Sequence, residues 1–264
     1  MVNIRTPQEM EAGVKAGRKL GPIFDFIRPH IVPGVSTLEL DRLCKEFILS
    51  TGSHPSFPTE EGYFWTICSS VNDGIIHQIP RKNVILKEGD ILKIDVGNID
   101  DETGFQGDAA RTFLVGEADE ESKKLAECAE ECFWECYKLV RPGLRVSDIG
   151  WCIQRVAESY GFSALREYGG HGIGRGMHED PFIPNAGIQL PHRGPMIKAN
   201  TLICIEPMVM AGKCQMRLQD DNWGVVTLDG RRAAHYENTI AVFPDHNEIT
   251  TVDSTVRARL EAIG

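Results

Sequence analysis

The chain has 264 residues, of which 42% are hydrophobic and 25% charged, and its formal net charge is −10. This composition suits one large globular domain or two small ones, and the negative charge argues against a nucleic-acid-binding protein, which usually presents a basic face. No apolar run approaches the roughly 20 residues of a membrane span, and the polar segment 1–9 lacks a signal core, so we expect a cytoplasmic protein with no membrane partner.

Two capped helices are predicted in the first part of the chain. Thr6 and Glu9 form a capping-box pattern with Pro7 between them, which predicts a helix that runs to about residue 27. Ser36 caps a second helix, and Gly52 ends it. Strands are then expected over 64–71, 91–97 and 111–115, and the tripeptide 72–74 is predicted to form a hairpin turn.

The second part begins with a long amphipathic helix, expected over residues 120–140, and a further helix that ends near Gly161. Cys128, Cys132 and Cys136 share one face of the long helix. None of the eight cysteines forms a Cys-x-x-Cys pair, so we interpret these three as buried reduced thiols rather than a metal or redox cluster. Three strands follow, over 201–210, 223–228 and 235–243.

Between these helices and strands lies a glycine-rich stretch, residues 169–179, that contains His171 and His178. Glycine costs about 1 kcal/mol relative to alanine inside a helix, which argues against a helix here. The glycine spacing also fails to match a dinucleotide-binding loop. We predict a tight loop that presents two imidazoles, with a backbone that bends or comes close to another group.

The two parts of the chain repeat one pattern at an interval of about 110 residues. The Pro33-Gly34 pair and the Pro142-Gly143 pair each follow a long helix and precede a capped one. Such internal similarity indicates one fold made of two related units. We therefore predict a single catalytic domain over 1–264, with a first half of about 1–116 and a second of about 117–264.

The repeat also places four acids at matching points on apolar strands. Asp95 ends one strand as Glu206 ends its counterpart, and Asp108 and Glu237 each begin the strand that follows. Buried carboxylates cost several kcal/mol each and repel one another unless cations compensate them. Together with His171 they suit a pair of divalent ions, Co, Mn, Fe or Zn, which can hold a hydroxide between them for hydrolysis.

The strings around these residues resemble the type I methionine aminopeptidases, which are metallopeptidases of the pita-bread fold. The resemblance spans essentially the whole chain and rests on Ile94-Asp95-Val96, Gly107-Asp108, Gly170-His171-Gly172-Ile173-Gly174, Ile205-Glu206-Pro207-Met208 and Tyr236-Glu237-Asn238-Thr239. It implies an α+β fold with two pseudo-twofold-related halves of antiparallel sheet covered by helices. It also implies removal of the initiator methionine from nascent proteins when the second residue is small.

The resemblance assigns roles to the five ligand candidates. Asp95 binds one ion, Asp108 and Glu237 bridge both, and His171 and Glu206 complete the other. Glu206 is also the general base, and the metal-bridged hydroxide attacks the scissile carbonyl.

The remaining roles that the resemblance implies concern the substrate and a second type of ion. His178 stabilises the scissile carbonyl, and His77 contacts the scissile nitrogen. The methionine pocket is formed by Phe57, Tyr63, Met177 and Trp223. A monovalent cation, Na or K, is held largely by backbone carbonyls of Asn72, Gly74 and Ala233.

Three places depart from the family pattern. Glu60, with Glu61 beside it, replaces an aromatic residue at the pocket rim, Gln78 replaces a glycine, and Asn238 replaces a histidine. None of them is a predicted metal ligand. The acidic rim leads us to expect a preference for substrates with a basic residue downstream of the methionine.

Two alternatives share the same fold. One is an enzyme related to Xaa-Pro aminopeptidases and prolidases, and the other is a non-enzymatic peptide-binding module. The presence of all five predicted metal ligands disfavours the non-enzymatic module. For the methionine aminopeptidase we expect nascent-chain N-terminal peptides as substrates, the ribosome as a candidate partner, no nucleic acid as substrate, and a monomer.

Overall fold

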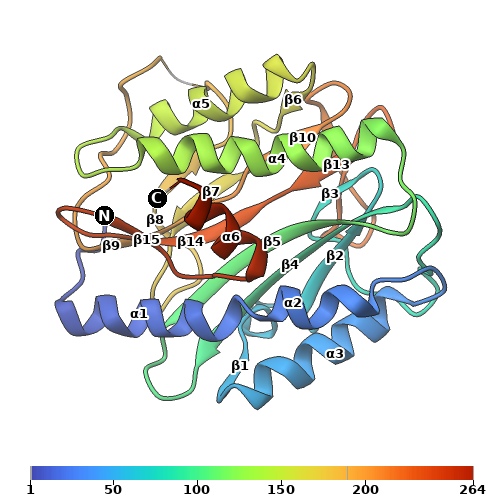
Figure 1. Cartoon of the computed structure of the whole chain (residues 1–264), viewed down its shortest axis with the longest axis horizontal. Coiled ribbons are helices and arrows are strands. Elements are labelled where there is room, and N and C mark those ends of the chain that lie inside the picture. Colours follow the sequence, from blue (N-terminus) through green and yellow to red (C-terminus); the bar gives the residue numbers. More distant parts are fainter. Residues whose placement is uncertain (1, 189, 264) are drawn as a thin grey trace.

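A central antiparallel sheet of nine strands runs through the molecule, with helices on its outer side (Figure 1). The computed structural model describes residues 2–188 and 190–263. The sheet contains β1 (Ser53–Pro55), β2 (Ile67–Val71), β4 (Ile91–Asp100), β5 (Gln106–Leu114), β7 (Gly169–Gly172), β8 (Glu179–Pro184), β9 (Thr201–Ile205), β14 (Glu237–Val242) and β15 (Asn247–Ile249). Its main path is β1-β4-β5-β14-β9-β7-β8, while β2 pairs with β4 and β15 with β14.

Two small sheets and six α-helices complete the fold in the described residues. One small sheet contains β13 (Ala233–His235), β10 (Met208–Met210) and β6 (Ser163–Ala164), and the other contains β11 (Met216–Leu218), β12 (Val225–Thr227) and β3 (Gly74–Ile76). The helices are α1 (Pro7–Leu20), α2 (Ile23–Ile27), α3 (Thr37–Ser50), α4 (Glu120–Leu139), α5 (Val146–Ser159) and α6 (Ser254–Ile263). None of the helices described is both long and apolar enough to cross a membrane.

The two largest hydrophobic cores each belong mainly to one half of the chain, and two smaller ones are shared between the halves. In the view of Figure 1, helices α1 to α3 lie at the bottom and α4 with α5 at the top, with α6 between the two groups. The α2 and α3 residues pack on β2, β4 and β5, whereas α4 and α5 pack on β9 and β14. Cys128, Cys132 and Cys136 are free thiols in this second core, which confirms their interpretation as buried hydrophobes.

The two halves meet where β5 pairs with β14. The register joins Glu237 to Ala110 and Asn238 to Ala109. Buried Arg111 spans this seam: it donates to the Glu237 carbonyl at 2.6 Å and to the Asn238 side chain at 2.8 Å, and forms an ion pair with Asp253 at 2.8 Å. The sheet pairing at the seam is therefore short, and the Arg111 guanidinium reinforces it.

The local helix signals are confirmed, and one helix length is wrong. The Thr6–Glu9 capping box is present, and Ser36 accepts a hydrogen bond from the Glu39 backbone at the start of α3. The first predicted helix is two helices, because the chain breaks after Leu20. A Cβ on Gly21 would lie 2.4 Å from the backbone nitrogen of Val252, so tertiary approach sets this break.

The glycine-rich stretch is partly a strand rather than wholly a loop. Residues Gly169–Gly172 form β7, which pairs with β8 and β9. A Cβ on Gly170 would lie 2.1 Å from the Cys204 carbonyl oxygen. The close approach expected from these glycines is thus an approach of β7 to β9, which brings His171 beside the strands that carry the acids.

Two predicted strand arrangements also differ. The turn at residues 72–74 is present, but β3 pairs with β12 rather than with β2. The expected strand over 201–210 is interrupted after Ile205, because Pro207 lacks the N–H that a ladder requires. This interruption separates β9 from β10 and leaves Glu206 at the strand end.

Candidate metal centre

Strand register explains why the four acids share one place. Asp95 on β4 and Glu237 on β14 both pair with Ala110 on β5, so the three residues form one row across the sheet. Cross-strand partners point to the same face, and so do residues two apart on one strand, which adds Asp108. Glu206 directly follows the β9 residue that pairs with Asn238, beside Glu237.

The acids open into one cavity of about 110 Å³. It contains all five predicted ligands, both predicted substrate histidines and three of the four predicted pocket residues. Its lining consists of Phe57, Glu60, Tyr63, Cys68, His77, Asp95, Asp108, His171, His178, Glu206, Trp223 and Glu237.

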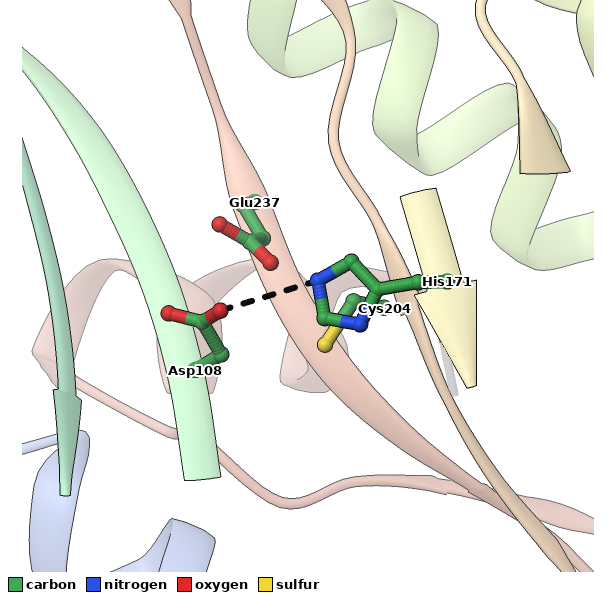
Figure 2. A group of neighbouring side chains, drawn as sticks. All are labelled: Asp108, His171, Cys204 and Glu237. Atoms are coloured by element: carbon green, nitrogen blue, oxygen red, sulfur yellow. Dashed lines mark ion pairs between the residues drawn. The ribbon is translucent and has the colours of Figure 1, made fainter. Parts of the chain in front are cut away.

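His171 is oriented as a ligand. Its Nδ1 lies 2.9 Å from the Gly172 carbonyl oxygen, which can only accept, so the ring proton is on Nδ1 and the Nε2 lone pair is free. That Nε2 lies 3.7 Å from Asp108 Oδ2 and 3.6 Å from Glu206 Oε1. Figure 2 shows the imidazole directed at Asp108 and Glu237, with the thiol of Cys204 beneath it.

Burial makes these acids resist ionisation. Desolvation raises the pKa of Asp95 to about 7 and raises the pKa values of Asp108, Glu206 and Glu237 well above their usual range. Mutual repulsion among the carboxylates adds to the last three shifts.

The donor set fits divalent ions. Within the described chain, one oxygen each of Asp95, Asp108 and Glu237 is buried without a hydrogen-bond partner. Burial also lowers the pKa of His171 to about 3, which keeps its imidazole neutral and able to bind a cation. Buried, unpaired, mutually repelling oxygens beside a neutral imidazole are the arrangement that a cation stabilises.

The two other histidines lie on the substrate side of the acids. The His178 ring stacks edge-on to the His171 ring with centroids 4.6 Å apart. His77 has a positive φ of 60° and lies edge-on to Tyr168. Such a backbone conformation is unusual for a residue with a side chain and concentrates at functional sites. Burial lowers the pKa of His77 to about 4, so both its donor and its acceptor nitrogen are available.

An aromatic wall closes the other side of the cavity. Tyr63 packs edge-on against Trp223 with centroids 4.9 Å apart, and Phe57 packs edge-on against Tyr63 at 6.2 Å. The Tyr63 hydroxyl is satisfied by the Ile67 carbonyl, so the wall presents rings rather than polar atoms. Met177 is buried next to Phe57 and does not line this cavity, unlike its three predicted companions.

Two cysteines near the acids were missed in the sequence. Cys68 on β2 pairs with Asp95 and lines the cavity. Cys204 Sγ lies with ligand atoms of Asp108, His171 and Glu237 inside a 4.8 Å group. Burial raises both thiol pKa values well above the usual range, so these cysteines are neutral. In the sequence, the only signal for Cys204 is the alternation of side chains along β9, which puts it on the same face as Glu206.

The carbonyls predicted to hold a monovalent cation lie beside a lysine. Ala233 donates its backbone N–H to the Asn72 carbonyl at 3.0 Å, and the buried Lys93 amino group donates to the same oxygen at 2.9 Å. Desolvation lowers the pKa of Lys93 to about 7. An amine of the protein itself therefore lies against the first of the three predicted carbonyls.

The three departures from the family pattern have separate surroundings. The Gln78 side chain accepts from the Val71 backbone at 2.9 Å and donates to Gln219. Asn238 accepts from Arg111 at the seam. Glu60 lines the cavity. Burial lowers the pKa of His178, and the negative charge of Glu60 partly opposes that shift. Of the three, Glu60 is the one placed to meet substrate.

Comparison with known proteins agrees with this geometry. Residues 11–244 match metallopeptidase family M24. A methionine aminopeptidase of Clostridium acetobutylicum is 42% identical over 96% of this chain and 99% of its own length. A methionine aminopeptidase of Escherichia coli K12 is 38% identical over 97% of both chains.

Solved structures give the same result. The crystal structure of methionine aminopeptidase from Thermotoga maritima superposes with a TM-score of 0.92 at 39% identity, covering 96% of this chain and 100% of the other. Prolidase from Pyrococcus furiosus has a TM-score of 0.76 at 18% identity and is matched over 66% of its length, which shows a shared fold alone. The chain thus has the pita-bread fold and belongs to metallopeptidase family M24 and, within it, to the methionine aminopeptidases.

Proposed function

We propose that this metal-dependent exopeptidase removes the initiator methionine from nascent proteins whose second residue is small. The observation that carries the proposal is the single cavity in which four acids and His171 face an aromatic wall. The names of relatives that match nearly the full chain support it. We further propose that it acts as a monomer in the cytoplasm, with the ribosome as a candidate partner.

The proposed metal ligands are Asp95, Asp108, His171, Glu206 and Glu237, holding two divalent ions drawn from Co, Mn, Fe and Zn. Bound there, such ions supply Lewis acidity and a water of low pKa. Asp108 and Glu237 lie on the paired strands β5 and β14, so they would be the central ligands of the set. Asp95 lies on the β4 side of this pair, and His171 and Glu206 lie on the β9 side.

The chain's own groups then handle the substrate and its protons. Glu206 accepts the proton of the attacking water on its carboxylate and later gives that proton to the leaving amine. His178 donates a ring N–H to the oxygen of the scissile carbonyl, where negative charge develops. His77, which lines the same cavity, contacts the scissile nitrogen.

The aromatic wall accounts for the preference for methionine. Phe57, Tyr63 and Trp223 offer ring edges and faces to an unbranched thioether, which makes favourable contacts with aromatic rings. The cavity is small, so a residue placed beyond the scissile bond meets the histidines unless its side chain is short.

Metal stripping and peptide choice test the proposal together. The chelated protein should cleave neither Met-Ala nor Xaa-Pro peptides, and adding back Mn, Fe, Co or Zn one at a time should restore cleavage of Met-Ala peptides alone. The measurement is the amount of free methionine released, determined by chromatography. Metal-independent cleavage, or restored cleavage of Xaa-Pro peptides alone, would refute the proposal.

The acidic rim supports a prediction about the residues that follow the methionine. Exchanging Glu60 and Glu61 for Gln should lower the ratio of kcat/KM for Met-Ala-Lys over Met-Ala-Glu peptides by about threefold, the scale of an exposed charge pair. The effect should fade as salt rises. The matched control is Glu120→Gln with Glu121→Gln on α4, which removes the same charge outside the cavity. An unchanged ratio in the rim variant contradicts the prediction.

A further inference from the structure

A buried imidazole lies behind the carboxylates and has no part in the reaction described so far. His235 is the last residue of β13, and its side chain is 1% exposed. Its Nε2 lies 3.9 Å from Glu206 Oε2 and 4.0 Å from Glu237 Oε2. Neither ring nitrogen has a hydrogen-bond partner in the part of the chain that the structure describes.

Glu206 consequently has an imidazole on each side. Its Oε1 lies 3.6 Å from His171 Nε2, and its Oε2 lies 3.9 Å from His235 Nε2. The two imidazoles differ in access: His171 lines the cavity, whereas His235 lies behind the acids and does not. His235 is therefore placed to hold a carboxylate from behind rather than to bind an ion in the cavity.

The backbone fixes the imidazole in this place. The Thr112 hydroxyl donates to the His235 carbonyl at 2.8 Å and accepts from its N–H at 2.9 Å. His235 also pairs with Met208 on β10, and the next residue, Tyr236, donates to the Pro207 carbonyl. Since Pro207 and Met208 directly follow Glu206, the imidazole and that carboxylate belong to one tightly connected unit.

An imidazole carries at least one N–H in any protonation state. A buried donor without a partner costs about 1–3 kcal/mol, so its surroundings must satisfy it. The carboxylate oxygens of Glu206 and Glu237 are within 4.0 Å, and a shift of about 1 Å brings Nε2 to hydrogen-bond distance of either. Groups that hold a metal ligand in this way typically change metal affinity ten- to a hundredfold when removed.

We propose that His235 is a positioning residue: its ring N–H donates to the outer oxygen of Glu206 and keeps the other oxygen directed into the cavity. The inference rests on the proposed function, because it assigns Glu206 as metal ligand and base. It gives a role to a buried polar ring whose two nitrogens have no other hydrogen-bond partner among the described residues.

Two variants separate this role from simple packing. His235→Leu fills the space without a donor, whereas the amide nitrogen of His235→Gln can take the place of Nε2. Calorimetric titration of the chelated protein with Mn²⁺ should show at least tenfold weaker binding for His235→Leu and binding within threefold of wild type for His235→Gln. With Met-Ala peptides the Leu variant should lose kcat with little change in KM, and the Gln variant should recover most of it.

The melting temperature of the chelated protein is the control for folding, and it should stay close to the wild-type value in the Leu variant, because leucine fills the space of the ring. If that variant does not fold, His235→Met is titrated in its place. Mn²⁺ binding within twofold of wild type in the donor-free variant, or equal loss in the Gln variant, overturns the proposal. A wild-type protein that binds Mn²⁺ but leaves Met-Ala peptides uncut would instead overturn the proposed function, and the titrations would still decide the role of His235.

Discussion

Glu237→Gln is expected to lower kcat for a Met-Ala peptide by at least about a thousandfold, which corresponds to about 4 kcal/mol of transition-state stabilisation. The amide keeps the size of the side chain but removes a negative oxygen that we propose to be shared by both ions. Glu237 is 2% exposed and pairs with Ala110 at the seam, so no neighbouring acid can replace it. A continuous peptide assay and a Mn²⁺ titration of the same preparation measure the two losses together.

The same variant should gain stability once the metal is removed. Burial and repulsion by Asp108 raise the pKa of Glu237 well above its usual range, so ionising it in the folded protein is unfavourable. The neutral amide avoids this cost, and the chelated variant should melt above chelated wild type at pH 8. Glu117→Gln, an exposed change, is the matched control and should alter neither property. Activity within tenfold of wild type would contradict the assignment of Glu237 as a ligand.

The second large effect is a loss of stability of the chelated protein as pH rises from 7 to 8. The folded-state pKa values of Asp108, Glu206 and Glu237 lie well above the unfolded values near 4. Groups with raised pKa values stabilise the fold below the unfolded pKa and lose that contribution as pH rises through the folded one. Each proton that the folded chain still holds and the unfolded chain has released costs about 1.4 kcal/mol of stability per pH unit.

Other buried groups either titrate below this pH range or oppose the acids within it. The buried histidines, including His77 and His171, have lowered pKa values, so their contribution is lost only as pH falls below about 6.5. Lys93 has a lowered pKa of about 7 and therefore adds stability as pH rises, opposing one of the acids. The net change from pH 7 to 8 remains a loss, and Lys93→Met should steepen it.

Metal should reverse the trend, because ligands bind ions only when deprotonated. The melting temperature measured with excess Mn²⁺ minus that measured with chelator should grow steadily at pH 7, 7.5 and 8. Scanning calorimetry at constant ionic strength gives both values. A chelated protein whose melting temperature holds level or rises over this range would show that the acids are not suppressed by burial.

Local signals in the sequence predicted what local physics decides. The Thr6 and Ser36 caps and the position of Glu206 directly after β9 are as predicted and depend on neighbours in the chain. Asp95, in contrast, lies inside β4 rather than at its end, because the strand continues to Asp100 where it pairs with β1. The duplicated pattern predicts that the acids of both halves lie together, and the pairing of β5 with β14 brings this about. The fold class, in contrast, is predicted by the resemblance to a known family.

What could not be predicted depends on which distant backbone a residue meets. The Gly169–Gly172 segment has no side-chain pattern of a strand and becomes one because β8 and β9 pair with it. Met177 is adjacent to His178 in the chain, yet it is buried near Phe57 and is not among the residues that line the cavity. Lys93 and His235 look like ordinary surface residues in the sequence, and only the tertiary structure shows that both are buried.

The seam between the halves has a consequence for how finely the centre can be tuned. Asp108 comes from β5 and Glu237 from β14, so the β5–β14 contact places the acids of the two halves side by side. Arg111 donates to the Glu237 carbonyl at that contact and has no hydrogen bond to a carboxylate of the centre among the described residues. A change at Arg111 would therefore alter how the two halves meet without changing a proposed ligand.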